Sequence, residues 1–199
     1  MRKAVVYIHG AGGNAEESGH YKPLFPDCDV IGFDYKSETP WEAKEEFPAF
    51  IESVKAGHDS VILIANSIGA FFSMQSLSEA EIEKAYFISP IVDMENLICQ
   101  MMQWAGVTED DLREKGIIKT GFGPDLSWDY LTWVRENPVK WTVPTAILHG
   151  GRDNMQSDEI IAAFAKNIGA KLTNWAEGEH WFHTDEQMAV LDRFIQDLN

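Results

Sequence analysis

Cysteine and basic residues are scarce in this chain of 199 residues. The two cysteines, Cys28 and Cys99, form neither a C-x-x-C pair nor a spacing typical of metal ligands. We therefore expect two buried small hydrophobic side chains rather than a disulfide. The 16 basic residues are outnumbered by 32 acidic ones, for a net charge of −16. A surface of that charge repels DNA, RNA and anionic membranes, so we expect neither nucleic acid nor a membrane as a partner. The alternative is that the charge serves solubility alone.

Long hydrophobic runs are also missing. After Arg2 and Lys3, the first apolar run extends only from Ala4 to Ile8, which is too short for the core of a signal peptide. No stretch approaches the length needed to cross a membrane, and we expect a protein of the cytoplasm. Hydrophobic residues still make up 45% of the chain, which is enough for one domain with its own core.

Six short apolar runs alternate with helical patterns along the chain. Runs of this kind are typical of strands that are buried on both faces of a parallel sheet. The alternation predicts an α/β fold, with a three-layer, doubly wound and mostly parallel six-stranded sheet. The runs are Lys3–Gly10, Asp29–Tyr35, Ser60–Ser67, Ala85–Pro90, Pro144–Gly150 and Lys171–Ala176.

Helix start and stop signals lie between these runs. Thr39 matches a capping box with the glutamate three residues later, while Pro48 inside the same pattern predicts a kink or a late start. A second helix is expected between Ser157 as its cap and Gly169 as its stop. Thr184 is expected to cap the last helix.

A serine follows the third run, in the sequence A-N-S-I-G at Ala65–Gly69. A strand, a sharp turn and a helix at this point would expose the Ser67 Oγ at the top of the sheet. Such a turn needs small residues two positions before and after the serine, and Ala65 and Gly69 satisfy that need. The alternative is a serine that only caps a helix, and the motif alone does not separate the two.

A glycine turn, H-G-A-G-G, follows the first run at His9–Gly13. Glycines here would let backbone N–H groups approach a bound oxyanion. We expect the amides of Ala11 and Ile68 to form that oxyanion hole, with Gly12 as the second choice for the first donor. A phosphate-binding loop is the alternative, but G-x-G-x-x-G and the P-loop lysine are both missing.

An acid and a histidine follow the fifth and sixth runs. Asp153 ends H-G-G-R-D, and His180 lies in G-E-H. Serine, acid and histidine thus occur in the order expected of a hydrolase triad. Because the carboxyl ends of parallel strands meet at one edge, we expect Ser67, Asp153 and His180 to lie close together there, as nucleophile, acid and base.

Two residues compete for these roles. Asp93 follows the fourth run and could supply the acid, and His183 could be the base. Asp153 is preferred because G-G-R-D matches the turn expected of the acid. His180 is preferred because His183 is better placed near the cap of the last helix. His149, His180 and His183 could bind a metal, but no H-E-x-x-H motif or cysteine ligand accompanies them, and we expect no metal.

Together the four motifs resemble the α/β-hydrolase superfamily, in a compact carboxylesterase-like form. The resemblance implies that the family's first two strands are missing, because H-G-A-G-G already follows the first run. It also implies hydrolysis of an acyl ester or thioester of a small apolar substrate through an acyl-enzyme, without a cofactor. Ala65 stands where glycine is usual and Asn66 where histidine is frequent, and the second departure leaves the substrate preference open.

The resemblance covers nearly the whole chain, so we expect one hydrolase domain over residues 1–199. Within it, residues 91–143 contain no convincing strand and exceed the usual spacing between strands. We expect a helical cap, with Met101, Trp104 and Trp128 lining an apolar substrate pocket beside Gly12. The alternative is a helical layer that packs its own core. The alternative function is a non-catalytic binding protein on a hydrolase scaffold, against which the complete set of candidate residues argues.

Overall fold

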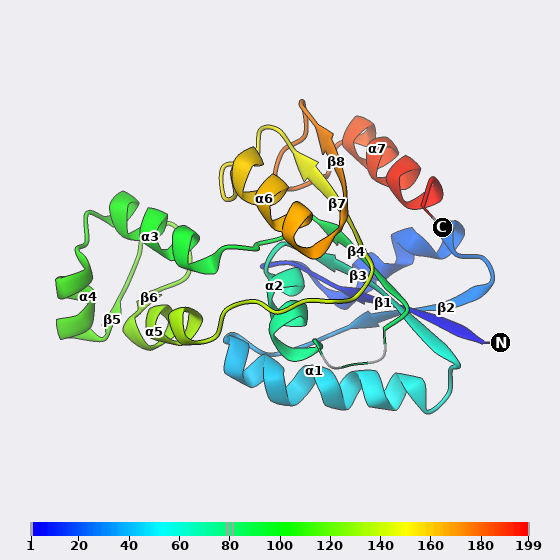
Figure 1. Ribbon diagram of the computed structural model, residues 1–199, viewed down its shortest axis with the longest axis horizontal. Helices are drawn as coiled ribbons and strands as arrows, with labels where there is room; N and C mark the ends of the chain where they lie inside the picture. The colour runs from blue at the N-terminus through cyan, green and yellow to red at the C-terminus, as the bar shows by residue number, and fades with distance from the viewer. Residues whose placement is uncertain (1, 79, 81, 199) are drawn as a thin grey trace. The chain divides into compact units, whose positions relative to one another are not determined.

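One six-stranded sheet forms the centre of the structure, a computed structural model that describes residues 2–78, 80 and 82–198. Its strand order is β2-β1-β3-β4-β7-β8, and every neighbouring pair is parallel (Figure 1). The predicted sheet is therefore confirmed, and its strands lie within one residue or two of the predicted runs. The strands are β1 (Lys3–Ile8), β2 (Cys28–Phe33), β3 (Ser60–Asn66), β4 (Lys84–Ile88), β7 (Thr145–Gly150) and β8 (Lys171–Trp175).

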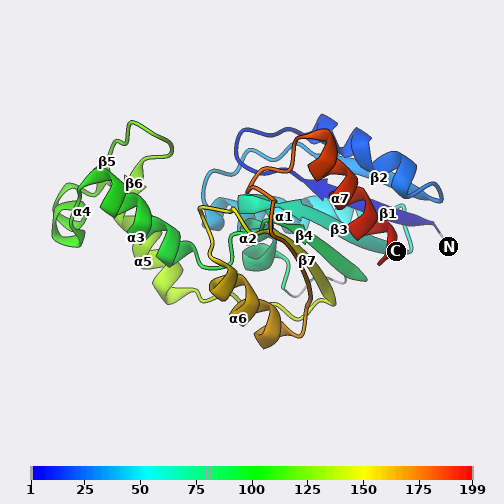
Figure 2. The same ribbon diagram turned by 90° about the horizontal axis from the view of Figure 1, so that it is seen from above.

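Helices cover both faces of this sheet. Figure 2 shows the 3₁₀ helix η1 (Ala15–Leu24) and α7 (Asp185–Gln196) on one side. On the other side lie α1 (Pro40–Lys55), α2 (Ser67–Ser76) and α6 (Asp158–Ile168). This is the predicted three-layer, doubly wound arrangement. The helix η1 was not predicted, although Asn14 and Glu17 form a capping box at its start.

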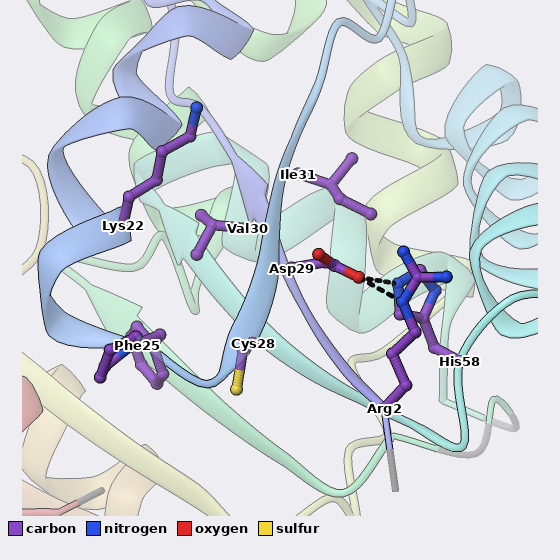
Figure 3. A pocket seen from close by; sticks show the side chains of 9 residues that line it. Arg2, Lys22, Phe25, Cys28, Asp29, Val30, Ile31 and His58 are labelled. Carbon is purple, nitrogen blue, oxygen red and sulfur yellow. Dashed lines mark hydrogen bonds and ion pairs between the residues drawn. The ribbon is translucent and has the colours of Figure 1, made fainter.

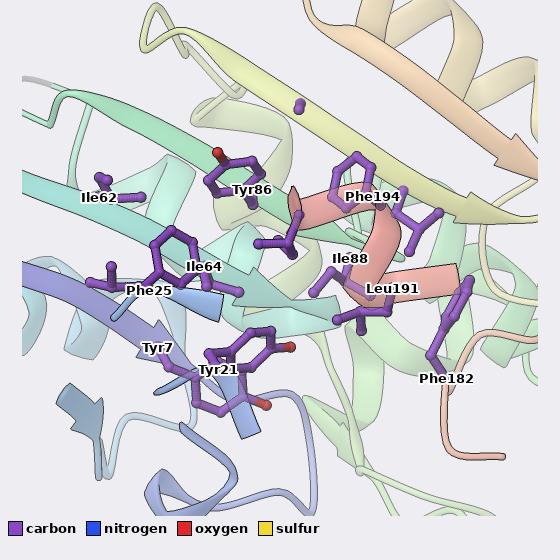
Figure 4. Close-up of a cluster of buried hydrophobic side chains, with 14 residues drawn as sticks. Tyr7, Tyr21, Phe25, Ile62, Ile64, Tyr86, Ile88, Phe182, Leu191 and Phe194 are labelled. Carbon is purple, nitrogen blue, oxygen red and sulfur yellow. The ribbon is translucent and has the colours of Figure 1, made fainter. Parts of the chain in front are cut away.

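The core explains why the strands are apolar at almost every position. Successive side chains of a strand point to opposite faces, and here both faces are covered. Figure 4 shows the face toward η1 and α7, where aromatic side chains of the sheet and of the helices pack together. The buried residues of this face include Tyr7, Ile62, Ile64, Tyr86 and Ile88 from the strands, and Tyr21, Phe25, Leu191 and Phe194 from η1, α7 and the segment after η1.

The predicted helix signals have the expected places. Thr39 caps α1 through a complete capping box, and α1 continues through Pro48, so the late start does not occur. Ser157 caps α6, which ends at Gly169 with a left-handed φ of +69°. Thr184 caps α7.

The chain divides into two compact units, one of Met1–Val92 with Lys140–Asn199 and the other of Asp93–Val139. The second unit lies within the predicted insertion and contains α3 (Met94–Ala105), α4 (Glu109–Lys115) and α5 (Trp128–Glu136). The expectation of no strand there is wrong, because β5 (Ile117–Ile118) pairs antiparallel with β6 (Leu126–Ser127). Two-residue strands are too short to produce a periodic signal in the sequence.

One expectation from the sequence concerns the burial of the two cysteines. Cys28 and Cys99 are free thiols, but both are partly exposed, so the expectation that they are buried is wrong. Cys28 begins an edge strand, which has a neighbour on one side only.

None of the helices in the described parts of the chain is long and apolar enough to cross a membrane.

The capping box of α1 provides a test of the local sequence signals. Thr39→Ala removes the acceptor of the Glu42 amide, and we expect it to lower the free energy of unfolding by about 1 kcal/mol. Thr39→Ser keeps the hydroxyl and should retain most of the stability. Urea denaturation measures both, and equal losses in the two variants would contradict the assignment.

Candidate active site

The candidate site lies where the strand order reverses. From β1 the chain moves to β2 on one side and then returns to β3 on the other side of β1. Ligands of open α/β sheets bind beyond the carboxyl ends of the strands at such a point. Ile8 pairs with Ala65 at the end of this register, so the glycine turn and Ser67 follow side by side. A Cβ on Gly10 would lie 3.1 Å from the Ser67 Cβ.

Ser67 has a strained backbone at this point. Its φ is +51°, in the left-handed region that favours glycine, and α2 begins at the same residue. The turn brings α2 close to β1, because a Cβ on Gly69 would lie 2.3 Å from the carbonyl oxygen of His9. Only glycine fits there without displacing the backbone, while Ala65 is fully buried and fits as alanine.

Ser67, His180 and Asp153 form one chain of hydrogen bonds. The Ser67 Oγ lies 2.8 Å from the His180 Nε2, and the His180 Nδ1 lies 2.7 Å from the Asp153 Oδ2. The other oxygen of Asp153, Oδ1, accepts from the amides of Met155 at 2.8 Å and Gln156 at 3.3 Å. This fully buried carboxylate thus accepts from three donors, which offset the cost of burying its charge.

The competing residues are engaged in other contacts. Asp93 caps α3 by accepting from a backbone amide of that helix. The His183 Nδ1 lies 2.7 Å from the carbonyl oxygen of Trp181, and the two rings are stacked. His149 is buried at the end of β7, with its Nδ1 3.7 Å from the Asp153 Oδ2. The structure brings Asp153 and His180, not Asp93 and His183, into hydrogen-bonded contact around Ser67's hydroxyl.

The glycine turn forms one wall of a pocket of about 600 Å³ that contains Ser67 and His180. The Gly13 amide donates to the Gly10 carbonyl at 3.1 Å, and Gly12 has a φ of +75°. Ala11 and Gly12 line the pocket. Ile68, the second expected donor, is the second residue of α2, where backbone amides have no partner within the helix.

The rest of the pocket was not predicted from the sequence. One wall is polar, with Tyr7, Glu17, Tyr21 and Asn66. The apolar lining residues are Ile88, Met155, Phe182, Met188 and Leu191. Two signals in the sequence could have predicted this polar wall. The alternation of β1 directs Tyr7 to the same face as Val5, and Glu17 completes a capping box.

Met101, Trp104 and Trp128, the expected pocket residues of the insertion, all belong to the second unit. Their place in a substrate pocket stays a prediction. Within the described residues, no group of three or more His, Cys, Asp or Glu side chains could hold a metal ion.

A second hollow lies at the opposite, amino ends of β1 and β2 (Figure 3). Two of its basic side chains share one carboxylate, since the Asp29 Oδ2 lies 2.6 Å from the Arg2 Nε and 3.0 Å from the His58 Nε2. Its lining residues include no serine, so it offers no second arrangement of a serine beside a histidine.

Comparisons with known proteins agree with this architecture. No protein-family model matches the chain. A segment of 75 residues is 35% identical to "Putative esterase/lipase 3" of Mycoplasma genitalium, and the match covers 36% of this chain and 27% of that protein. The alpha/beta hydrolase domain-containing protein 10 from mouse aligns at a TM-score of 0.74 and 13% identity, over 98% of this chain and 88% of its own.

A second solved structure, Est1E from Butyrivibrio proteoclasticus with ferulic acid bound, aligns at a TM-score of 0.77 and 17% identity. That alignment covers 98% of this chain and 87% of Est1E. The chain therefore has the α/β-hydrolase fold, as its motifs predict.

The close approach of α2 to β1 can be tested by adding a methyl group. Gly69→Ala would place that methyl against the His9 carbonyl, and we expect the free energy of unfolding to fall by about 1–3 kcal/mol. Gly19→Ala in η1 is the matched control, because its added methyl meets open space. Thermal unfolding compares the two variants, and an unchanged melting temperature in Gly69→Ala would contradict the tight contact.

Proposed function

From the α/β-hydrolase fold and the pocket at Ser67, we propose that this protein is a serine hydrolase that cleaves an acyl ester or thioester of a small molecule. The observation that carries this proposal is the unbroken chain of hydrogen bonds from the Ser67 hydroxyl through His180 to the buried Asp153. Est1E, a structural neighbour with bound ferulic acid, and the matched esterase/lipase segment support ester chemistry.

In the first half-reaction, the Ser67 Oγ attacks the acyl carbonyl carbon while its proton passes to the His180 Nε2 at 2.8 Å. The Nδ1–H of His180 donates to Asp153, which orients the imidazole and stabilises its charged form. His180 then gives its proton to the leaving alcohol or thiol as the carbonyl–heteroatom bond breaks, and the acyl group remains on Ser67.

In the second half-reaction, His180 takes a proton from a water molecule that attacks the acyl-enzyme. The proton returns to the Ser67 Oγ as the acid product leaves. In both steps the carbonyl oxygen becomes negatively charged, and the amides of Ala11 and Ile68 are the proposed donors to it. Removing one such donor costs about 3–4 kcal/mol of transition-state stabilisation in comparable enzymes.

The unit Asp93–Val139 is the proposed cap of this single hydrolase domain. Two of its aromatic side chains, Trp104 and Phe122, are exposed and pack edge to face with each other. Exposed aromatic side chains are suited to contact an acyl group. We propose that Trp104 contributes in this way to substrate binding, with Met101 and Trp128 as further apolar contacts.

A fluorophosphonate probe tests the nucleophile. Such probes react covalently with an activated serine, so the wild-type protein should be labelled and Ser67→Ala should not. Ser53→Ala, which changes an exposed serine of α1, should be labelled like the wild type. Labelling is measured by gel fluorescence, and equal labelling of Ser67→Ala and wild type would refute Ser67 as the nucleophile.

The acid and the base can be tested with matched pairs of variants. Asp153→Asn should lower kcat by about ten-thousandfold with the fold intact, because the imidazole loses its orienting carboxylate. His180→Ala should abolish ester turnover. Asp93→Asn changes the competing acid, which caps α3 and does not line the pocket, and should retain activity within about threefold. His183→Gln changes a residue that lines the pocket without a hydrogen bond to Ser67, and it should retain far more activity than His180→Ala. Steady-state hydrolysis of a butyrate ester measures all four, and a larger loss in Asp93→Asn than in Asp153→Asn would move the acid role to Asp93.

A further inference from the structure

Three histidines line the pocket, and each lies beside a carboxylate. A positive charge on any of them is therefore matched by a negative charge next to it. The pairs are His180 Nδ1 with Asp153 Oδ2 at 2.7 Å, His20 Nε2 with Asp192 Oδ1 at 2.6 Å, and His183 Nδ1 with Glu179 Oε2 at 3.8 Å.

Glu17 is different, because its carboxylate lines the pocket without a cation beside it. It accepts from the Tyr7 hydroxyl and from the Asn14 amide at 3.3 Å, both of which are neutral donors. Among the described residues, no Lys, Arg or His nitrogen lies within ion-pair distance of Glu17, and no Lys or Arg lines the pocket. Glu17 is therefore the one carboxylate among the described residues that line the pocket, and no basic side chain is paired with it.

This charge lies next to the glycine turn. A Cβ on Gly13 would be 2.8 Å from the Glu17 Oε1, so the carboxylate and the turn are in contact. The field of Glu17 also reaches the pocket wall: burial raises the pKa of Tyr21, and the negative charges of Glu17 and Asp192 raise it further. A negative charge here opposes the oxyanion that forms during acyl transfer, unless a cation of the substrate compensates it.

An aromatic face is available for such a cation at the same pocket. Trp181 lines it with 72% of its surface exposed, and its ring is stacked on that of His183 with centroids 4.3 Å apart. An indole face attracts ammonium groups more strongly than other side-chain rings do.

We propose that the pocket at Ser67 selects a cationic substrate, an ester whose acyl or alcohol part carries an ammonium group that pairs with Glu17. This inference rests on the proposed serine hydrolase function and names its substrate class. Glu17 is the specificity-determining residue and Trp181 the aromatic contact. An anionic ester, which would face Glu17 without a basic residue nearby, is the substrate that the pocket disfavours.

Isosteric esters separate charge from shape. Butyrylcholine is compared with the dimethylbutyl ester in which carbon replaces the nitrogen, and a trimethylammonio-butyrate ethyl ester is compared with its all-carbon isostere. In wild type, at least one cationic ester should have a kcat/KM about fivefold above its neutral partner, a size typical of partly exposed ion pairs. The preference should decrease at high salt, which screens an ion pair but not a shape contact.

The variants then assign the preference to one carboxylate. Glu17→Gln keeps one acceptor oxygen, which can accept from the Asn14 amide as in other capping boxes, while its NH2 group faces the Tyr7 hydroxyl as a donor. The fold should therefore be retained while the cationic preference falls to about one. Glu16→Gln removes the neighbouring exposed charge of the same helix, which does not line the pocket, and should leave the preference unchanged. Equal loss of turnover on both esters in Glu17→Gln, with the ratio unchanged, would show a structural role only and overturn the proposal.

A binding measurement makes this test independent of turnover. Saturation-transfer NMR compares choline with its neutral dimethylbutanol isostere on the same three proteins. Choline that binds wild type and Glu16→Gln more strongly than Glu17→Gln supports the cationic site. If choline binds in this way but no ester is cleaved, only the hydrolase function is refuted. Equal binding of both alcohols to wild type, or cationic and neutral esters cleaved at equal rates, overturns the cationic substrate class.

Discussion

The parallel pairing of β1 with β3 is the contact on which the site depends. It brings the glycine turn after Ile8 beside the serine turn after Ala65, with a tight contact at Gly10 and no room for a side chain at Gly69. The left-handed backbone of Ser67 costs about 1–3 kcal/mol, and it persists only where the surrounding structure holds it. Here a hydrogen bond of 3.2 Å from the Ile91 amide to the Ser67 carbonyl contributes to that restraint.

A second backbone contact aligns the acid with the histidine. A Cβ on Gly150 would lie 2.5 Å from the Gly178 backbone, and the Arg152 amide donates to the Gly178 carbonyl at 2.8 Å. The turn that carries Asp153 and the loop that carries His180 are therefore held against each other by their backbones. The geometry of the two side chains follows from this contact, which explains why both loops contain glycine where they meet.

Charge is distributed unequally around the pocket. Asp153 is buried, and its negative charge is stabilised by two backbone amides and by His180. Glu17 faces the same pocket with neutral donors only. The chain has a net charge of −16, and no Lys or Arg lines this pocket, so the proposed cation for Glu17 is that of a substrate. The excess of Asp and Glu over Lys and Arg in the chain is thus also found among the residues that line the pocket.

Local signals in the sequence determined the six strands, the caps at Thr39, Ser157 and Thr184, and the order of Ser67, Asp153 and His180 along the chain. Apolar periodicity and capping are properties of neighbouring residues, so they can be recognised without the fold. Other features were not predicted from local signals, namely the helices η1 and α4, the β5–β6 pair and the polar wall at Glu17. Only the tertiary structure decided which side chains share the pocket, because η1, β1, β3 and α7 meet there through contacts between residues far apart in the sequence.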